Sequence, residues 1–300
     1  MKIPALPAHA AKIAKRHRVE NGKKFRLEDY DSADTAGLPE RAGDKGRDIL
    51  ADAVAELSDL QNRLYAENKH AVLIIFQAMD AAGKDGTISH VMSGVNPQGC
   101  RVTSFKQPGP EELGHDFLWR CTKALPERGM IGIFNRSYYE ETLVVRVHPE
   151  LLAKQGLDPE PDKDFWAERF ESIRAFEEHL VRNGTIVLKF FLHVSKDEQK
   201  RRFLSRLDDP KKHWKFSGAD LAERAHWDDY MHAYEQTIRH TATPGAPWHI
   251  IPADHKWYMR YAVTAAILDA LKKIDPQFPK LSKAETAELQ KSRKVLESER

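Results

Sequence analysis

The chain has 300 residues, of which 41% are hydrophobic, and its 47 basic and 45 acidic residues leave a formal net charge of +2. This length supports one large α/β domain or two small ones, and the balanced charge does not indicate a nucleic-acid-binding protein. Two cysteines, Cys100 and Cys121, are too few for a disulfide framework and indicate a reducing compartment. No apolar run approaches the roughly 18 residues of a membrane-spanning helix. We therefore expect a cytoplasmic protein without membrane or nucleic-acid partners.

The first third of the chain leads into a buried strand. Residues 1–45 are mixed, charged and glycine-containing, and we expect them to form an extended arm over the surface of the domain. Apolar residues at helical spacing predict an amphipathic helix over 46–68. The continuous apolar run 71–76 then predicts a strand that is buried on both faces.

The segment after this strand has the pattern of a phosphate-binding loop. The standard pattern is G-x-x-x-x-G-K-[ST], and this chain has Ala78 in place of the first glycine and Asp85 in place of the hydroxyl residue. The central pair Gly83-Lys84 is unchanged. Backbone N–H groups, a helix N-terminus and a lysine charge together favour an anion. The alternative is an ordinary strand-to-helix turn with a surface lysine.

The rest of the chain alternates between helices and strands. The further predicted strands are 101–105, 130–134, 186–194 and 248–251. The further predicted helices are 84–94, 111–125, 162–181, 196–207, 219–240 and 256–273. This alternation indicates an α/β fold with a mainly parallel five-stranded sheet and helices on both of its faces. Residues 276–300 are charged and helix-prone, and we expect a loosely attached tail.

In a parallel sheet, ligands bind beyond the carboxyl ends of the strands, and the predicted loop lies at such an end. Lys84 occupies the position from which a P-loop lysine reaches β- and γ-phosphates. Asp80 lies inside the loop, where a carboxylate is unfavourable beside phosphate unless a cation such as Mg²⁺ bridges the two. The same argument applies to Asp85, although an aspartate in the first turn of a helix also suits the helix dipole.

The end of the third predicted strand carries a second group of polar residues. A P-loop enzyme places a metal-binding aspartate here, and Asn135 keeps an oxygen ligand while it loses the charge. Arg136 has the forked donor geometry that suits phosphate oxygens. Glu140 could supply the missing carboxylate from the next turn. Taken alone, Asn135 could equally be a turn or helix-capping residue.

Residues 196–215 hold eight basic residues against four acidic ones. This excess is larger than one nucleotide needs, and beside a phosphate site it predicts a helical lid, over about 196–218, that closes on a substrate with many phosphates. The alternative is a solvated helix face. The basic residues assigned to the lid are Lys200, Arg201, Arg202, Arg206, Lys211, Lys212 and Lys215.

Four segments together resemble the family-2 polyphosphate kinases, over about residues 25–273. The segments are 77–88, 134–140, 198–216 and 246–257. The resemblance implies a P-loop kinase fold similar to thymidylate kinase over 46–275, with a helical lid. It also implies reversible phosphoryl transfer from inorganic polyphosphate to nucleotides with Mg²⁺ or Mn²⁺, in a homo-oligomer that is a dimer or a tetramer. Asn135 and the residues after it are similar to the class III members, which phosphorylate both AMP and ADP, the latter to ATP.

The resemblance also implies roles for individual residues. The residues expected to be catalytic are Asp80, Lys84, Arg136 and Glu140. Those expected to hold the metal are Asp80, Asn135 and Glu140. Those expected to bind phosphate or nucleotide are Met79, Ala82, Gly83, Asp85, Gly86, Thr87, Asn135 and Arg146.

Two other functions remain open on the residues alone. A nucleoside monophosphate kinase that uses ATP as donor shares the loop but does not need so long a basic stretch. A non-catalytic protein that binds polyphosphate or nucleic acid on a P-loop scaffold explains the basic stretch, but it does not explain Asp80 and Glu140.

Overall fold

The computed structural model describes residues 6–39, 42–156 and 162–299, and the structural statements below concern these residues. The strands are β1 (Arg18–Val19), β2 (Ala71–Gln77), β3 (Cys100–Ser104), β4 (Ile131–Asn135), β5 (Thr185–His193) and β6 (Trp248–Pro252). The α-helices are α1 (Leu6–His17), α2 (Ala42–Glu67), α3 (Lys84–Val91), α4 (Pro110–Leu113), α5 (Trp119–Thr122), α6 (Val144–Val147), α7 (Lys163–Arg182), α8 (Lys196–Leu207), α9 (Gly218–Ala225), α10 (Trp227–Thr241), α11 (Lys256–Ile274) and α12 (Lys283–Ser298). The short 3₁₀ helices are η1 (Gly22–Lys24), η2 (Leu27–Asp29), η3 (Pro97–Gly99), η4 (Tyr138–Thr142), η5 (Pro149–Gln155) and η6 (Pro210–Lys215).

The six strands form one sheet in the order β1-β6-β5-β2-β4-β3. The five strands β2 to β6 pair in parallel, and β1 pairs with β6 in the antiparallel direction. From β2 the chain first builds the side that holds β3 and β4, and then crosses to build the side that holds β5 and β6. The strand order therefore reverses at β2, and a ligand crevice is expected at the carboxyl end of this strand.

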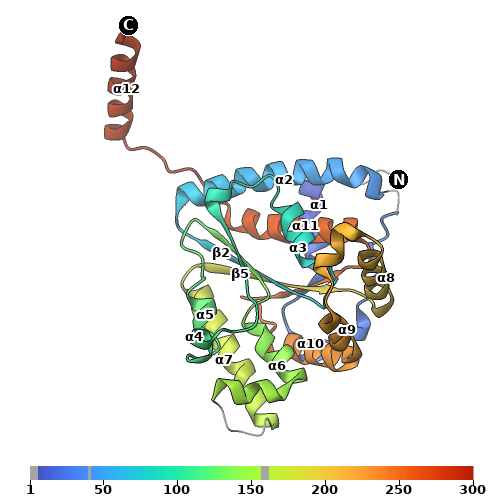
Figure 1. Cartoon of the computed structure of the whole chain (residues 1–300). Helices are drawn as coiled ribbons and strands as arrows, with labels where there is room; N and C mark the ends of the chain where they lie inside the picture. The colour runs from blue at the N-terminus through green and yellow to red at the C-terminus, as the bar shows by residue number, and fades with distance from the viewer. Residues whose placement is uncertain (1–5, 40–41, 157–161, 300) are drawn as a thin grey trace.

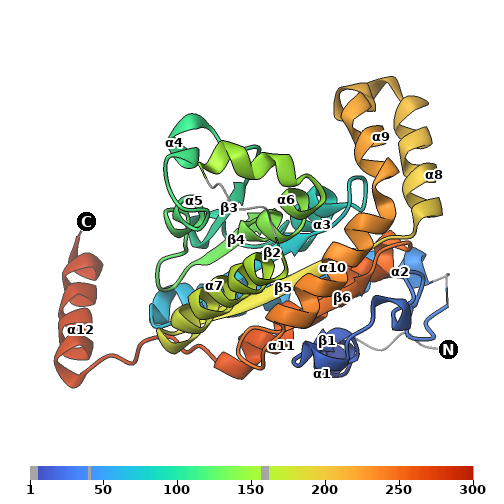
Figure 2. The same cartoon turned by 90° about the horizontal axis from the view of Figure 1, so that it is seen from below.

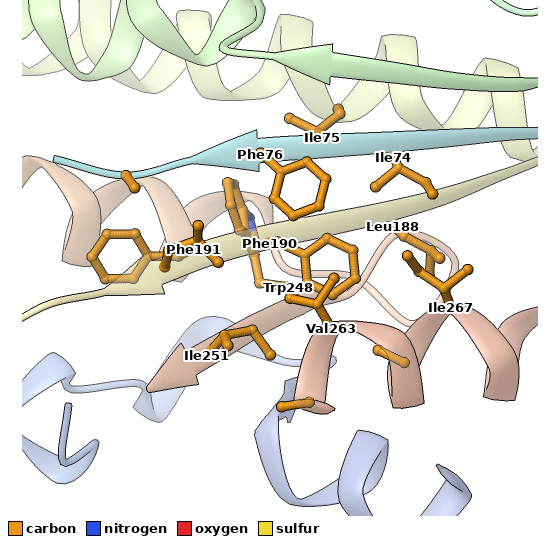
Figure 3. Close-up of a cluster of buried hydrophobic side chains, with 14 of the residues drawn as sticks. Ile74, Ile75, Phe76, Leu188, Phe190, Phe191, Trp248, Ile251, Val263 and Ile267 are labelled. Carbon is orange, nitrogen blue, oxygen red and sulfur yellow. The ribbon is translucent and has the colours of Figure 1, made fainter. Parts of the chain in front are cut away.

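Helices cover both faces of the sheet (Figure 1). α1, α2, α3 and α11 lie on one face, and α7 and α10 lie on the other. All seven residues of β2 are buried, as expected for a central parallel strand. Figure 3 shows Phe76 stacked near Phe190, with Val263 and Ile267 of α11 beside these strands; the two phenyl centroids lie 5.1 Å apart. This core holds the strand ends in fixed positions relative to one another.

The N-terminal segment differs from the predicted extended arm. Leu6, Ala10 and Ala14 lie on one side of α1 and are almost fully buried, because their spacing of four residues gives the helix an apolar face. α1 packs against α11, and β1 adds a sixth strand to the five that were predicted. Residues 1–5 and 40–41 of the predicted arm lie outside the described residues.

Two predicted helices are each divided into two. The segment 111–125 contains α4 and α5, with a break that begins at Gly114, the residue that caps α4. The segment 219–240 contains α9 and α10, which meet at His226. The second break matters for the site because it separates α9, which stands beside α8, from α10, which packs on the sheet (Figure 2).

The C-terminal segment extends away from the sheet (Figure 1). The residues of α12 are exposed along its whole length. No helix in the described part of the chain is long and apolar enough to cross a membrane.

Candidate functional site

The loop between β2 and α3 has the geometry of an anion-binding turn. Two of its residues, Ala81 at φ +61° and Gly83 at φ +109°, have left-handed backbone conformations. α3 begins directly after them at Lys84, and its first helical hydrogen bond runs from the N–H of Thr87 to the carbonyl of Gly83. The first N–H groups of a helix have no partner within the helix, so this end of α3 presents donors and a positive dipole.

The side chain of Lys84 reaches back over the loop. Its Nζ donates to the carbonyl oxygen of Ala78 at 2.7 Å. Burial lowers the pKa of Lys84, and the positive charge of Arg136 lowers it further, while Asp80, Glu140 and Asp85 act in the opposite direction. The ammonium group of Lys84 therefore lies within the field of one further positive charge and three carboxylates.

The parallel pairing of β2 with β4 brings the second polar segment next to the loop. Phe76 lies opposite Asn135 in the strand register, and the N–H of Arg136 donates to the carbonyl of Phe76 at 3.1 Å. Nδ2 of Asn135 donates to Oδ1 of Asp85 at 2.7 Å. A carboxylate at position 135 could not make this bond, so the uncharged amide allows Asp85 to approach the end of β4.

Arg136 is the centre of the charged cluster. One of its terminal nitrogens, Nη2, lies 3.1 Å from Oδ1 of Asp80, and Nη1 lies 3.0 Å from Oε2 of Glu140. The charges of Glu140 and Asp80 raise the pKa of Arg136 above its ordinary value. The structure thus brings together the four residues expected to be catalytic, because Lys84 lies within the electrostatic reach of the other three.

A buried polar network supports this cluster, and sequence reasoning did not find it. With the Gln77 amide turned so that its nitrogen faces Glu140, Nε2 donates to Oε1 of Glu140 at 2.9 Å, and the amide oxygen accepts from Ser137. Below them, Tyr139 donates through its hydroxyl to Glu177 at 2.6 Å, and Lys189 donates to the same carboxylate at 2.6 Å. Gln77 and Lys189 lie in otherwise apolar runs, and Glu177 lies in a charged helix far from both in the sequence, so the sequence gives no sign that these residues belong to one network.

The predicted lid is a helical hairpin built from α8, η6 and α9, and it stands away from the sheet (Figure 2). Its two helices are tied together: Arg224 donates to the carbonyl of Lys196 at 2.7 Å, and Arg206 lies 3.7 Å from Asp220. The exposed lysine and arginine residues of the hairpin are Lys196, Lys200, Arg201, Lys211 and Lys212. The side chain of Lys215 lies outside the described part of the structure.

Three predicted site residues have other surroundings than expected. Arg202 is 7% exposed and bonds to backbone carbonyls, so it does not face an open lid. Thr87 is 0% exposed, so its hydroxyl is buried in this structure. Arg146 stacks over the rings of Trp166 and Phe170, at 5.3 and 5.8 Å from their centroids, in a separate small core. Trp166 and Phe170 come from α7, far from Arg146 in the sequence, so the local sequence gives no sign of this stacking.

The other residues predicted to contact phosphate lie in the loop and in the first turn of α3. Met79 is 5% exposed and Ala82 is 0% exposed, and the carbonyl of Ala82 accepts from Arg202, so neither residue presents an open side chain. Asp85 and Gly86 are exposed in the first turn of α3. Two residues that were not predicted also lie within the field of the cluster: burial and the Asp80 charge raise the pKa of Asp220, and burial and the Glu140 charge raise that of Tyr234.

The carboxylates do not form a ready-made metal cage. Among the residues that the structure describes, no group of three or more His, Cys, Asp or Glu side chains could hold a metal ion. Asp80 and Glu140 are instead joined through Arg136, and Asn135 contacts Asp85. Magnesium in kinases is held by one or two protein oxygens together with substrate phosphates, and the donor set here is of that kind.

Two cavities of about 430 Å³ each lie away from this cluster. Both are lined by Tyr30 and His193, and neither is lined by residues of 77–87 or 135–140. They are therefore not the place where the phosphate loop acts.

Comparisons with known proteins agree with this geometry. The family model described as Polyphosphate kinase 2 (PPK2) matches residues 41–279. An ADP-polyphosphate phosphotransferase of Rhodopseudomonas palustris is 50% identical over 282 residues, which cover 91% of this chain and 98% of that protein. An AMP/ADP-polyphosphate phosphotransferase of Meiothermus ruber is 45% identical over 265 residues, which cover 88% of this chain and 95% of that protein. The crystal structure of polyphosphate kinase 2 from Arthrobacter aurescens superimposes with a TM-score of 0.84 at 43% identity. The match covers 93% of this chain and 96% of that chain.

Proposed function

This chain belongs to the polyphosphate kinase 2 family, and we propose that it transfers phosphoryl groups from inorganic polyphosphate to AMP and ADP, forming ADP and ATP reversibly. The names of two similar proteins support this choice, because one specifies ADP and the other AMP and ADP. The observation that carries the proposal is the meeting of Lys84, Arg136 and Asp80 beside the N-terminus of α3. This cluster offers fixed positive charge and an oxygen ligand at one point.

We assign the fold to the P-loop kinases, in the group similar to thymidylate kinase. The phosphate loop follows the central strand β2, and the arginine-bearing turn follows β4, its neighbour in the sheet. A helical hairpin follows β5 on the other side of β2. These three features support the assignment because all of them follow the carboxyl ends of neighbouring parallel strands.

The proposed reaction is an in-line displacement. A terminal phosphate oxygen of AMP or ADP attacks the end phosphorus of polyphosphate; a new P–O bond forms, and the bridging P–O bond to the shortened polyphosphate breaks. Lys84, Arg136 and the N–H groups of α3 stabilise the charge on the transferring group. Asp80 orients the attacking oxygen or accepts its proton, and Glu140 holds Arg136 in place. Most of the rate enhancement then comes from positioning.

Magnesium is the metal we propose for this reaction. Asp80 and Asn135 would hold it, because each offers a side-chain oxygen at the edge of the loop, while Glu140 contributes oxygens to Arg136 and Gln77. When bound, such an ion neutralises phosphate charge and aligns the reacting oxygens. The remaining ligands would be phosphate oxygens and water.

The lid is proposed to bind the polyphosphate chain. Its exposed basic residues Lys200, Arg201 and Lys211 lie on a hairpin beside the charged cluster, and a long anion needs a row of charges rather than one pocket. Arg206 remains a candidate at the inner side of the hairpin, near Asp220. Contacts of this kind are weakened by salt, so the KM for polyphosphate should rise with ionic strength.

We also propose that the enzyme works in the cytoplasm, as a dimer or tetramer. Two free cysteines and nucleotide substrates support the compartment. Light scattering of the purified protein tests the assembly, and a single monomeric species would contradict it.

A comparison of phosphate donors tests the function. The protein is incubated with Mg²⁺, AMP and long-chain polyphosphate without ATP, and in parallel with AMP and ATP without polyphosphate. The proposal predicts ADP and then ATP in the first reaction. Product in the second reaction alone would identify a nucleoside monophosphate kinase. Binding of polyphosphate without turnover would identify a non-catalytic binding protein.

A further inference from the structure

Three consecutive carbonyl groups of the phosphate loop are held by side chains of α8. Nε2 of Gln199 donates to the carbonyl of Asp80 at 3.0 Å. Nη1 of Arg202 donates to the carbonyls of Ala81 and Ala82, at 3.1 and 2.6 Å. The first two turns of a helix that follows β5 therefore fix the loop that follows β2.

Arg202 uses all of its donors in this arrangement. Besides the two loop carbonyls, Nη2 donates to the carbonyls of Ala253 and Asp254, which follow β6, and Nε donates to Glu198 at 2.7 Å. A guanidinium group has five N–H donors, so none of them remains for a substrate phosphate. Arg202 thus connects the segments after β2, β5 and β6 at one buried point.

These contacts explain how the loop keeps an unfavourable backbone. A left-handed conformation in a residue other than glycine, such as Ala81 at φ +61°, persists only where the surroundings hold it. Each carbonyl that turns toward α8 directs the N–H group of the same peptide plane to the opposite side. The N–H of Ala82 closes the turn by donating to the carbonyl of Met79 at 3.2 Å, and those of Ala81 and Gly83 face away from α8. A row of N–H groups on one side of a turn is an anion-binding concavity.

We propose that Arg202 and Gln199 are positioning residues that shape the phosphate loop for transfer, rather than lid residues that bind polyphosphate; this rests on the proposed kinase function. Gln199 also accepts from Nη1 of Arg224 on α9 at 2.8 Å. The second helix of the lid is thereby connected to the carbonyl of Asp80 through one side chain. A movement of the lid is transmitted to the loop by this route.

The variant Arg202→Lys tests the proposal, because lysine keeps the charge and loses the fork. We expect kcat to fall about 100-fold, the effect of a misplacement of about 1 Å, while the KM values for AMP and polyphosphate change little. Hydrogen exchange of the amides in 78–86 should become faster. A raised KM for polyphosphate with unchanged kcat would instead make Arg202 a substrate ligand and overturn the proposal.

Gln199→Met is the second variant, for the case that Arg202→Lys does not fold. It removes one neutral hydrogen bond to the loop, and kcat should fall roughly fivefold. Unchanged kcat together with unchanged loop exchange in this variant would also overturn the proposal.

Arg128→Lys is the matched control. Arg128 likewise donates to two backbone carbonyls, those of Lys69 at 2.6 Å and Asn183 at 3.2 Å, but at the opposite edge of the sheet. The kcat and the hydrogen exchange of the loop in Arg128→Lys should equal those of the unchanged protein. If kcat falls as far as in Arg202→Lys, the loss of any arginine that bonds two backbone carbonyls lowers kcat, and the proposal is overturned. If the unchanged protein forms no product from polyphosphate, the proposed function fails, and loop exchange alone decides the positioning role.

Discussion

Arg136 contacts two carboxylates from two different segments, and it does so from a left-handed backbone conformation at φ +64°. Such a conformation costs about 1–3 kcal/mol in a residue other than glycine. The surrounding structure holds it because the N–H of Arg136 bonds to Phe76 of the neighbouring strand. This conformation directs the guanidinium fork toward Asp80 and Glu140.

The fork of Arg136 should be needed for transfer as well as its charge. In Arg136→Lys a compact ammonium group cannot contact Asp80 and Glu140 at once, so kcat should fall by about 10². Steady-state kinetics with AMP and polyphosphate measure this loss, and a thermal melt confirms that the variant is folded. A kcat within about twofold of the unchanged enzyme would remove Arg136 from the proposed charge-stabilising groups.

Lys84 is the second residue whose charge should matter. Lys84→Ala should lose at least about 10² in kcat, the usual effect of removing one donor that stabilises transition-state charge. Lys69→Ala is the matched control, because Lys69 is exposed at the amino-terminal edge of the sheet. Near-normal turnover of Lys84→Ala would show that the loop does not act as a P-loop.

The sequence was sufficient to predict where these residues meet. Asp80, Lys84 and Arg136 each follow a parallel strand, and strand ends of adjacent strands lie together. The sequence does not predict the direction in which a charged side chain points. Arg202 and Arg206 share a helix face, and the sequence does not show that Arg202 is the buried one of the two. Its burial depends on the tertiary positions of the 81–82 and 253–254 carbonyls, which accept its hydrogen bonds.

At the scale of the elements, α1 is attached to α11 through a buried histidine. Nε2 of His17 lies 2.8 Å from the hydroxyl of Tyr258. Burial lowers the pKa of His17 from 6.5 to about 4. The negative charge of Asp34 raises the pKa of His17, and the positive charge of Arg16 lowers it further. Between pH 6.5 and about 4 the ring is therefore neutral in the folded protein, whereas the same ring in the unfolded chain binds a proton.

This attachment predicts a loss of stability in acid. Between pH 6.5 and about 4 the unfolded chain binds more protons at His17 than the folded chain does, so the free energy of unfolding falls as the pH falls. Above pH 6.5 the ring is neutral in both states, so this loss of stability is absent there. Thermal melts of His17→Gln across this window should show a shallower pH dependence, by up to one proton, and an unchanged slope would contradict the assignment. His249, with a pKa lowered by burial to about 3, acts in the same direction and remains in the variant.

The elements that sequence reasoning missed are those with weak local patterns. β2 to β6 are each five residues or longer, which is enough for an apolar run or, in β3, for an alternating pattern, and all were predicted. β1 has two residues, which is too short for any periodicity, and its pairing with β6 depends on α1 being docked. The apolar face of α1 was readable from Leu6, Ala10 and Ala14, but the charged residues around it favoured an arm.

At the scale of the whole molecule, the match to the family ends before α12. The family model stops at residue 279, and α12 is exposed over all its residues. We expect a chain that ends at residue 279 to keep its kcat and its melting temperature, because no core contact is removed. Loss of turnover on truncation would show that α12 completes the active site or the assembly. Comparing light scattering of the two chains separates these two explanations.

The central claim is that the phosphoryl group moves directly from polyphosphate to the nucleotide at the junction of the loop, Arg136 and the lid. The most direct measurement uses polyphosphate labelled with ³²P, together with unlabelled AMP and Mg²⁺ and without ATP. The account predicts label in the β-phosphate of ADP and in both the β- and γ-phosphates of ATP, and almost none with Lys84→Ala. Label that stays in polyphosphate while AMP remains unchanged would contradict it.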